Sequence, residues 1–324
     1  MLIREISVSP GRVLKATSVF ETYWRFAAKR QDIFMRRING GPAPWTDDPV
    51  LAAYRFTNVY RAADRVSQYL IANVIYRGPQ TAEEVFFRTL LFKFFNRIET
   101  WEELSRQLGD PSWRTFHFDR YARTLDAMLA RSERVYSAAY IMPSPPLVSA
   151  SKHRNHLRLL EHMMEDVVPR RIARARSLAE VFGVLRAYRS IGDFLAFQFA
   201  VDLNYSSLLD FSEMDFVVAG PGARDGIHKC FVDTGGLCEA DVIRVVTERA
   251  EEEFGRLGLR FQTLWGRPLQ LIDCQNLFCE VDKYARVVHP EVNGASGRTR
   301  IKQRFNPRPM SLPQWYPPKW GLKL

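Results

Sequence analysis

The chain has 324 residues, of which 46% are hydrophobic and 25% charged, a composition typical of globular proteins and not of disordered or fibrous ones. An excess of 46 Lys and Arg residues over 36 Asp and Glu residues gives a net charge of +10, so a polyanionic partner such as nucleic acid is one interpretation. No run of about 18 apolar residues and no signal-like start occur, which predicts a cytoplasmic protein without a membrane partner.

Hydrophobic spacing predicts helices along most of the chain. The expected helices cover residues 18–37, 49–60 with a bent or broken continuation to about 76, 84–95, 101–108, 119–132, 157–176, 178–188, 192–203, 213–218, 239–257 and 269–287. Asp48-Pro49, Thr81–Glu84 and Thr100–Glu103 read as helix starts. A strand is an alternative only near residues 136–141, so the predicted fold class is all-α.

The predicted organisation has three parts. Residues 1–48 form a helical extension, residues 49–290 a helical catalytic domain whose two lobes meet near 141–151, and residues 291–324 a basic, Pro-rich arm. The arm interleaves Lys and Arg with aromatic residues, which suits phosphate neutralisation and base stacking. An arm that simply packs over the domain surface is the alternative. The few cysteines lack the spacing of a metal site or a disulfide framework, so we expect reduced thiols and no metal.

The helix expected at residues 269–287 carries a polar stripe. Asp273, Asn276, Glu280 and Lys283 follow one another at spacings of three, four and three residues, and most of the remaining circumference is apolar. Such a helix is expected to be buried, with the stripe facing an interior cleft where ions need partners or a ligand. A solvated face with a ladder of salt bridges is the alternative.

A second polar set depends on residues 56–68 being helical. In that case Asn58, Arg61, Arg65 and Gln68 share a face with Asp64 at its edge, and two arginines one turn apart suit phosphate oxygens. A local ion pair between Arg61 and Asp64 is the alternative. A third set lies near Gly192 and comprises Arg189, Asp193 and Gln198.

Residues 213–227 resemble a helix–hairpin–helix motif built around Gly-Pro-Gly-Ala. The glycines let backbone N–H groups approach a DNA phosphate, which predicts backbone contacts at Gly220, Gly222, Ala223 and Arg224. A plain Gly-rich turn is the alternative. The sequence contains no GxxxxGK[ST] phosphate loop.

Together these motifs resemble the alpha-glutamyl/putrescinyl thymine pyrophosphorylases, which share a helical domain with the 5-hydroxymethyluracil DNA kinases of bacteriophages. The similarity covers residues 49–288 and rests on the segments 56–68, 192–205, 211–223 and 273–283. It implies a helix–hairpin–helix DNA glycosylase-like, two-lobed helical fold. The missing phosphate loop favours the transferase branch, in which an amine replaces pyrophosphate on a thymine-derived base in DNA.

The resemblance also implies roles and partners. Asp273 or Glu280 would accept the proton of the amine, while Arg61, Arg65 and Lys283 would neutralise the leaving pyrophosphate. Asn58, Gln68 and Asn276 would read a flipped base. The expected partners are double-stranded DNA carrying a modified thymine and an amino acid or polyamine, without a cofactor, in a phage-infected bacterial cell. A DNA glycosylase and a non-catalytic DNA-binding module of a kinase system are the alternatives.

Overall fold

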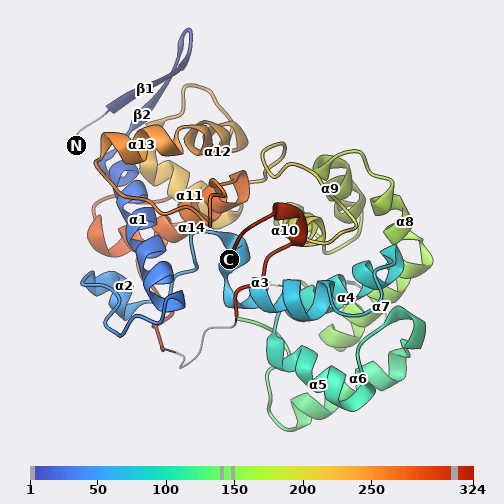
Figure 1. Cartoon of the computed structure of the whole chain (residues 1–324). Coiled ribbons are helices and arrows are strands. Elements are labelled where there is room, and N and C mark those ends of the chain that lie inside the picture. The colour runs from blue at the N-terminus through green and yellow to red at the C-terminus, as the bar shows by residue number, and fades with distance from the viewer. Residues whose placement is uncertain (1–3, 139–141, 147–149, 308–312) are drawn as a thin grey trace. The chain divides into compact units, whose positions relative to one another are not determined.

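A computed structural model of the protein describes residues 4–138, 142–146, 150–307 and 313–324. Most of these residues lie in helices, as Figure 1 shows, which confirms the mostly helical prediction. The α-helices are α1 (Ser18–Ile38), α2 (Pro49–Ala53), α3 (Arg65–Tyr69), α4 (Ala82–Phe95), α5 (Ile98–Leu108), α6 (Phe118–Ala130), α7 (Lys152–Glu165), α8 (Val168–Ala173), α9 (Leu178–Arg186), α10 (Asp193–Asn204), α11 (Pro221–Cys230), α12 (Glu239–Glu248), α13 (Ala250–Arg256) and α14 (Leu271–Val288). Shorter helical pieces are the 3₁₀ helices Arg61–Ala63, Trp113–Thr115 and Pro318–Trp320 and the π-helix Leu70–Ile75. None of the described helices combines the length and apolarity needed to cross a membrane.

A small antiparallel sheet corrects the expectation of an all-α fold. Its strands are β1 (Arg4–Ser9), β2 (Arg12–Ala16) and β3 (Phe231–Asp233), in the order β1-β2-β3. Strand β1 alternates Ile6 and Val8 with polar residues, whereas β2 lacks alternation and β3 is too short to show it. The strand considered near 136–141 is absent from its described residues 136–138, and residues 139–141 lie outside the described part of the chain.

The chain divides into two compact units, which are described separately. The first contains the described residues of Met1–Asp64, Phe216–Pro313 and Leu322–Leu324, and the second contains those of Arg65–Asp215 and Gln314–Gly321. The proposed division at residues 48 and 290, with lobes meeting near 141–151, stays a prediction.

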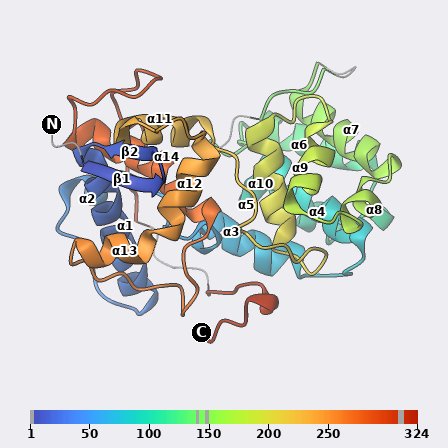
Figure 2. The same cartoon turned by 90° about the horizontal axis from the view of Figure 1, so that it is seen from above.

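In the first unit, α14 packs against α1, α11 and α12 (Figure 2). Helices α11 and α14 approach each other closely, since a Cβ atom added at Gly226 would lie 2.0 Å from the carbonyl oxygen of Phe278. Charge is also buried at this contact, since Lys229 Nζ lies 3.0 Å from Asp282 Oδ1 and both side chains are almost inaccessible. The close packing of α11 on α14 therefore fixes the position of the helix that carries Asp273, Glu280 and Lys283.

In the second unit, α4 is buried over nearly its whole circumference. It packs against α7, α8 and α10. A buried ion pair joins α4 to α10, with Lys93 Nζ 3.1 Å from Asp202 Oδ2. Near the C-terminal end of the chain, Lys319 Nζ donates to two carbonyl oxygens at the end of α10. One belongs to Asn204, the last residue of the helix, and the other to Ser206, two residues later.

Two predicted helices are wrong. Helix α2 ends at Ala53 because the next residues pair with another segment: Arg55 N donates to Gln303 O at 3.0 Å, so the helix cannot continue toward residue 60. Residues 213–218 are not helical either. The Ser212 hydroxyl accepts from Met214 N at 3.1 Å, a local bond that competes with helix formation. The predicted first helix of the helix–hairpin–helix motif is therefore missing.

Of the three helix starts predicted from local sequence, two are observed and one is not. Asp48 caps α2 and Thr81 caps α4, as predicted. Thr100 does not start a helix, because α5 already begins at Ile98 and the Thr100 hydroxyl donates to Val135 O at 2.8 Å. The helices expected at 157–176 and 239–257 are each divided in two, as α7 with α8 and α12 with α13.

Candidate functional site

Three carboxylates of the first unit hold the loop that follows α2. Glu280 Oε2 accepts from Thr57 N at 3.0 Å, and Asp273 Oδ1 accepts from Arg61 N at 2.8 Å. Within the loop, Asp64 Oδ1 accepts from Asn58 N at 2.7 Å. These bonds replace the helical hydrogen bonds that the sequence pattern predicted for residues 56–64, so the predicted shared helical face of Asn58, Arg61, Arg65 and Gln68 is wrong.

Asp273 is bound to backbone through both carboxylate oxygens. Besides Arg61 N, it accepts from Gln270 N at 3.0 Å and so completes a capping box at the start of α14. Its exposed fraction is 4%. These contacts show a positioning function, in which Asp273 fastens the loop to the helix; a catalytic role for it stays a prediction.

Farther along α14, Glu280 and Lys283 form an ion pair. Lys283 Nζ lies 2.6 Å from Glu280 Oε2, 3.4 Å from Arg55 O and 5.1 Å from the centre of the Phe56 ring. Glu280 is 6% exposed, while Asn276 and Lys283 are half-buried. The interpretation of a buried polar stripe is therefore confirmed for Asp273 and Glu280, whose partner is the loop of the same unit.

Arg30 on α1 also belongs to this cluster, although it is not among the residues predicted from the sequence. Its Nη2 donates to Asn58 Oδ1, while Nη1 is buried and has no hydrogen-bond partner among the described residues. Burial lowers the pKa of Arg30 to about 10, although the charges of Asp64 and Glu280 oppose this shift. A signal was present in the sequence, because Arg30 and Arg37 are seven residues apart and share one face of a helix.

The pKa of the Asp64 carboxyl group is raised well above its usual value. Burial raises it to about 6, against the opposing effects of the Asn58 backbone hydrogen bond and the charge of Arg30. Glu280 adds to the increase through like-charge repulsion. A carboxyl group with this pKa is largely ionised at neutral pH and is a stronger general base than an ordinary Asp carboxylate.

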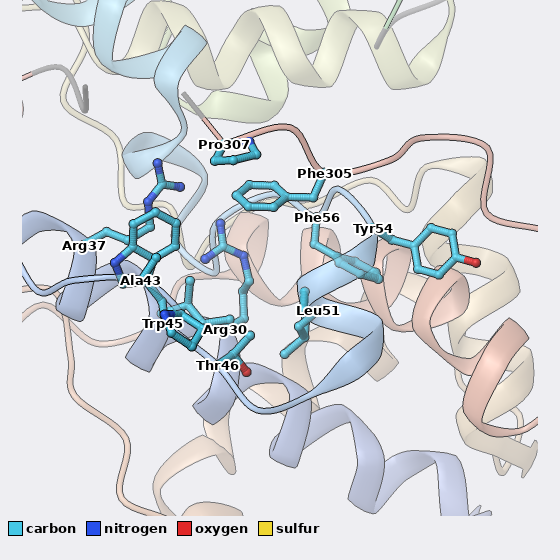
Figure 3. A pocket seen from close by; sticks show the side chains of 13 residues that line it. Arg30, Arg37, Ala43, Trp45, Thr46, Leu51, Tyr54, Phe56, Phe305 and Pro307 are labelled. Atoms are coloured by element: carbon cyan, nitrogen blue, oxygen red, sulfur yellow. The ribbon is translucent and has the colours of Figure 1, made fainter. Parts of the chain in front are cut away.

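A pocket of about 290 Å³ adjoins Arg30 in the same unit. Its lining consists of Arg30, Ile33, Arg37, Ala43, Pro44, Trp45, Thr46, Leu51, Ala52, Tyr54, Phe56, Phe305 and Pro307. Figure 3 shows Arg30, Arg37 and the ring of Phe305 among the side chains that line the pocket. The pocket thus combines aromatic rings with two cations.

The remaining predicted binding residues belong to the second unit. Gln68 Oε1 accepts from Trp315 N at 2.7 Å, and Asp193 pairs with Arg186 at the start of α10. Gln198 is buried within α10, while Arg65 and Arg189 are exposed. The structure therefore brings Asn58, Arg61 and Asp64 together with Asp273, Glu280 and Lys283 in the first unit, whereas Arg65, Gln68, Arg189, Asp193 and Gln198 belong to the second.

The Gly-Pro-Gly segment forms the start of α11. Gly220 is its N-cap, Ala223 is buried, and Arg224 is exposed near Glu239, with Nε 3.7 Å from Oε1. A Cβ atom at Gly222 would lie 2.4 Å from Cys279 Sγ, so this glycine permits close packing on α14. DNA-backbone contact by this segment stays a prediction. No group of three or more potential metal ligands occurs in the described segments.

Comparisons with known proteins add to this geometry. Residues 17–294 match the family described as "5-hmdU DNA kinase, helical domain". The chain is 28% identical over 316 residues to the 5-hmdU DNA kinase of Bacillus phage SP10, an alignment that covers 90% of this chain and 49% of the phage protein. The chain thus spans about half the length of that relative. No solved structure gives a significant match.

Proposed function

Because the chain belongs to the family of 5-hmdU DNA kinase helical domains, we propose that it acts on a thymine-derived base in DNA and replaces a pyrophosphate group on that base by an amine. The relation to this family supports a role in DNA thymidine hypermodification. The observation that carries the finer proposal is the cluster of half-buried Arg30, Asn58, Asp64 and Lys283 around buried Glu280, beside a pocket of the same unit.

The proposed reaction is a substitution at the methylene carbon of the base. The amine nitrogen forms a bond to this carbon, the carbon–oxygen bond to pyrophosphate breaks with its electron pair, and a carboxylate takes the surplus proton of the nitrogen. We assign proton acceptance to Asp64, whose pKa of about 6 suits a base near neutral pH, with Glu280 as its neighbour. Arg61 and Lys283 are proposed to balance the charge of the leaving pyrophosphate.

The other predicted contacts remain part of this proposal. Asn58 and Asn276 would bind the everted base, while Asp273 holds the loop that carries Asn58. The proposed DNA contacts outside this cluster are Arg65, Gln68, Arg189, Asp193, Gln198, Gly220, Gly222, Ala223 and Arg224.

The test is a reaction with duplex DNA that carries 5-pyrophosphoryloxymethyl-uracil and a panel of amino acids and polyamines. We expect release of pyrophosphate. In the digested nucleosides, the mass of the modified base should show that the pyrophosphoryloxy group has been replaced by the amine less one hydrogen. Asp64→Asn is expected to reduce turnover by a factor of about 10² or more. Pyrophosphate retained on the base with every amine would refute the proposal, whereas abasic sites would identify a glycosylase.

A second candidate is a module that recognises modified DNA for a kinase. It is supported by the match to the helical domain of 5-hmdU DNA kinases and by the occupation of both Asp273 oxygens by backbone N–H groups. Such a module would bind 5-hmdU DNA more tightly than thymidine DNA and leave the base unchanged. The mass analysis of the same reaction therefore separates the two candidates.

A further inference from the structure

We propose that the pocket lined by Arg30, Arg37, Trp45, Phe56 and Phe305 binds a pyrimidine ring that carries a phosphoryl group. This inference deepens the proposed function, on which its biological meaning rests, and it assigns the substrate site to a pocket within the first unit. The phosphoryl group is joined to the ring either through the sugar, as in a free pyrimidine nucleotide, or through the methylene carbon of a phosphorylated base in DNA.

The aromatic walls suit a planar ring. Trp45, Phe56 and Phe305 line the pocket together with Pro44 and Pro307, so apolar surface surrounds most of its space. A base that stacks on such side chains gains about 1–3 kcal/mol in nucleic-acid-binding proteins. The cavity of about 290 Å³ belongs to the size class of small-ligand sites.

The charges in the pocket select an anion. Its lining includes two arginines and no Asp or Glu, so an ammonium group would find no counterion there. Arg37 is half-buried and lines the pocket, so its guanidinium faces a ligand there. A phosphoryl oxygen would accept a charge-assisted hydrogen bond from this group.

Arg37 is already oriented by aromatic contacts. Its guanidinium carbon lies 4.7 Å from the centre of the Trp45 ring and 5.9 Å from that of Phe305. Such cation–π contacts hold the charge in the aromatic site before a ligand arrives. Less side-chain entropy is then lost on binding.

The pocket is connected to the carboxylate cluster. Arg30 reaches the pocket and also donates to Asn58, whose backbone N–H is bound by Asp64. A ligand that lies beside Arg30 in the pocket would therefore be near the group to which we assign proton acceptance. This connection favours a reacting base over an unrelated ligand.

Calorimetric titration of the full chain tests the proposal without any amine present. The probes are dTMP, thymidine, inorganic phosphate, and short DNA strands that carry either one 5-phosphoryloxymethyl-uracil or thymine at the same position. We expect the phosphorylated pyrimidines to bind at least about tenfold more tightly than thymidine or phosphate, since stacking and charge contribute together. Preference for the phosphorylated strand identifies DNA as the source, and binding of dTMP alone identifies the free nucleotide.

Two variants in the pocket and one outside it locate the binding. Arg37→Gln and Phe305→Ala are each expected to weaken binding of the preferred probe about tenfold. Arg36→Gln is the matched control, because Arg36 is exposed and pairs with Asp32 on the same helix. Thermal unfolding of each variant verifies that it is folded. Arg37→Lys is a second variant at the same position, in which the positive charge is kept and the guanidinium group is lost.

The pocket proposal is overturned if no probe binds, or if the folded Arg37→Gln and Phe305→Ala variants both bind like the unchanged protein. Failure of the proposed function has a different signature. In that case the probes bind in the pocket as described, but no pyrophosphate is released from modified DNA with any amine.

Discussion

Both carboxylate oxygens of Asp273 accept hydrogen bonds from backbone N–H groups, so substitution of Asp273 should reduce the stability of the fold. In Asp273→Asn, one acceptor oxygen becomes an NH₂ group that faces an N–H donor from Arg61 or Gln270. We expect a loss of about 1–3 kcal/mol in the free energy of unfolding, measured by urea denaturation.

The matched control is Asp32→Asn, since Asp32 is exposed on α1 and should change stability by less than about 0.5 kcal/mol. If Asp273→Asn keeps full stability and loses only turnover, the positioning role is refuted and the catalytic role regains support.

His156 gives the second unit a pH-dependent stability. Burial lowers its pKa to about 4, and Tyr136 Oη and Pro143 O lie 2.7 and 2.9 Å from its two ring nitrogens. A carbonyl only accepts, so Nε2 carries the proton and Nδ1 accepts from the tyrosine. The unfolded chain binds a proton near pH 6.5, so stability should fall as the pH drops from 6.5 through 4.

Melting temperatures measured across this pH range test the expectation. His156→Gln removes the titrating group, so its melting temperature should fall less between pH 6.5 and 4 than that of the unchanged protein, whatever its value at pH 7. Parallel curves for the two proteins would contradict the assignment.

At the scale of elements, the α11–α14 contact depends on the absence of a side chain. Gly226→Ala would place a Cβ atom 2.0 Å from Phe278 O, and backbone cannot move away as a side chain can. We expect a loss of about 1–3 kcal/mol or more in unfolding free energy. Gly183→Ala on α9 is the control, since no atom lies within 4 Å of its added Cβ and it should gain up to about 1 kcal/mol. Equal effects of the two changes would refute the close-packing argument.

Elements with local signals were predictable, and elements decided by distant partners were not. The caps Asp48 and Thr81 bond to backbone within three residues, so the sequence contains the whole interaction. The loop after Ala53 depends instead on Gln303 and Glu280, more than 200 residues away. No periodicity within a short window can reveal such competition.

The candidate site follows the same rule. The stripe of Asp273 and Glu280 was predicted because both lie on one helix with regular spacing. Arg30 was missed because its importance comes from contacts with Asn58 and with a pocket assembled from several segments. Sequence spacing identified the carboxylates, and only the tertiary structure identified their cationic neighbour.

At the scale of the whole molecule, the net charge of +10 favours DNA through its phosphates. If about six phosphates are contacted, duplex affinity should fall by about 10³ between 50 and 200 mM salt, with a slope near −0.9 per phosphate. Filter binding or fluorescence anisotropy over this salt range measures the slope. An affinity that is insensitive to salt would contradict an electrostatic DNA surface.

The division into units has a consequence for how the protein is made. The segment Arg65–Asp215 emerges from the ribosome as one stretch and supplies nearly all of the second unit. The first unit must wait, because β2 pairs with β3 and α1 packs on α14, which are synthesised more than 200 residues later. During translation the early hairpin and α1 therefore expose apolar surface until α14 is available, a period in which chaperones would have their greatest effect.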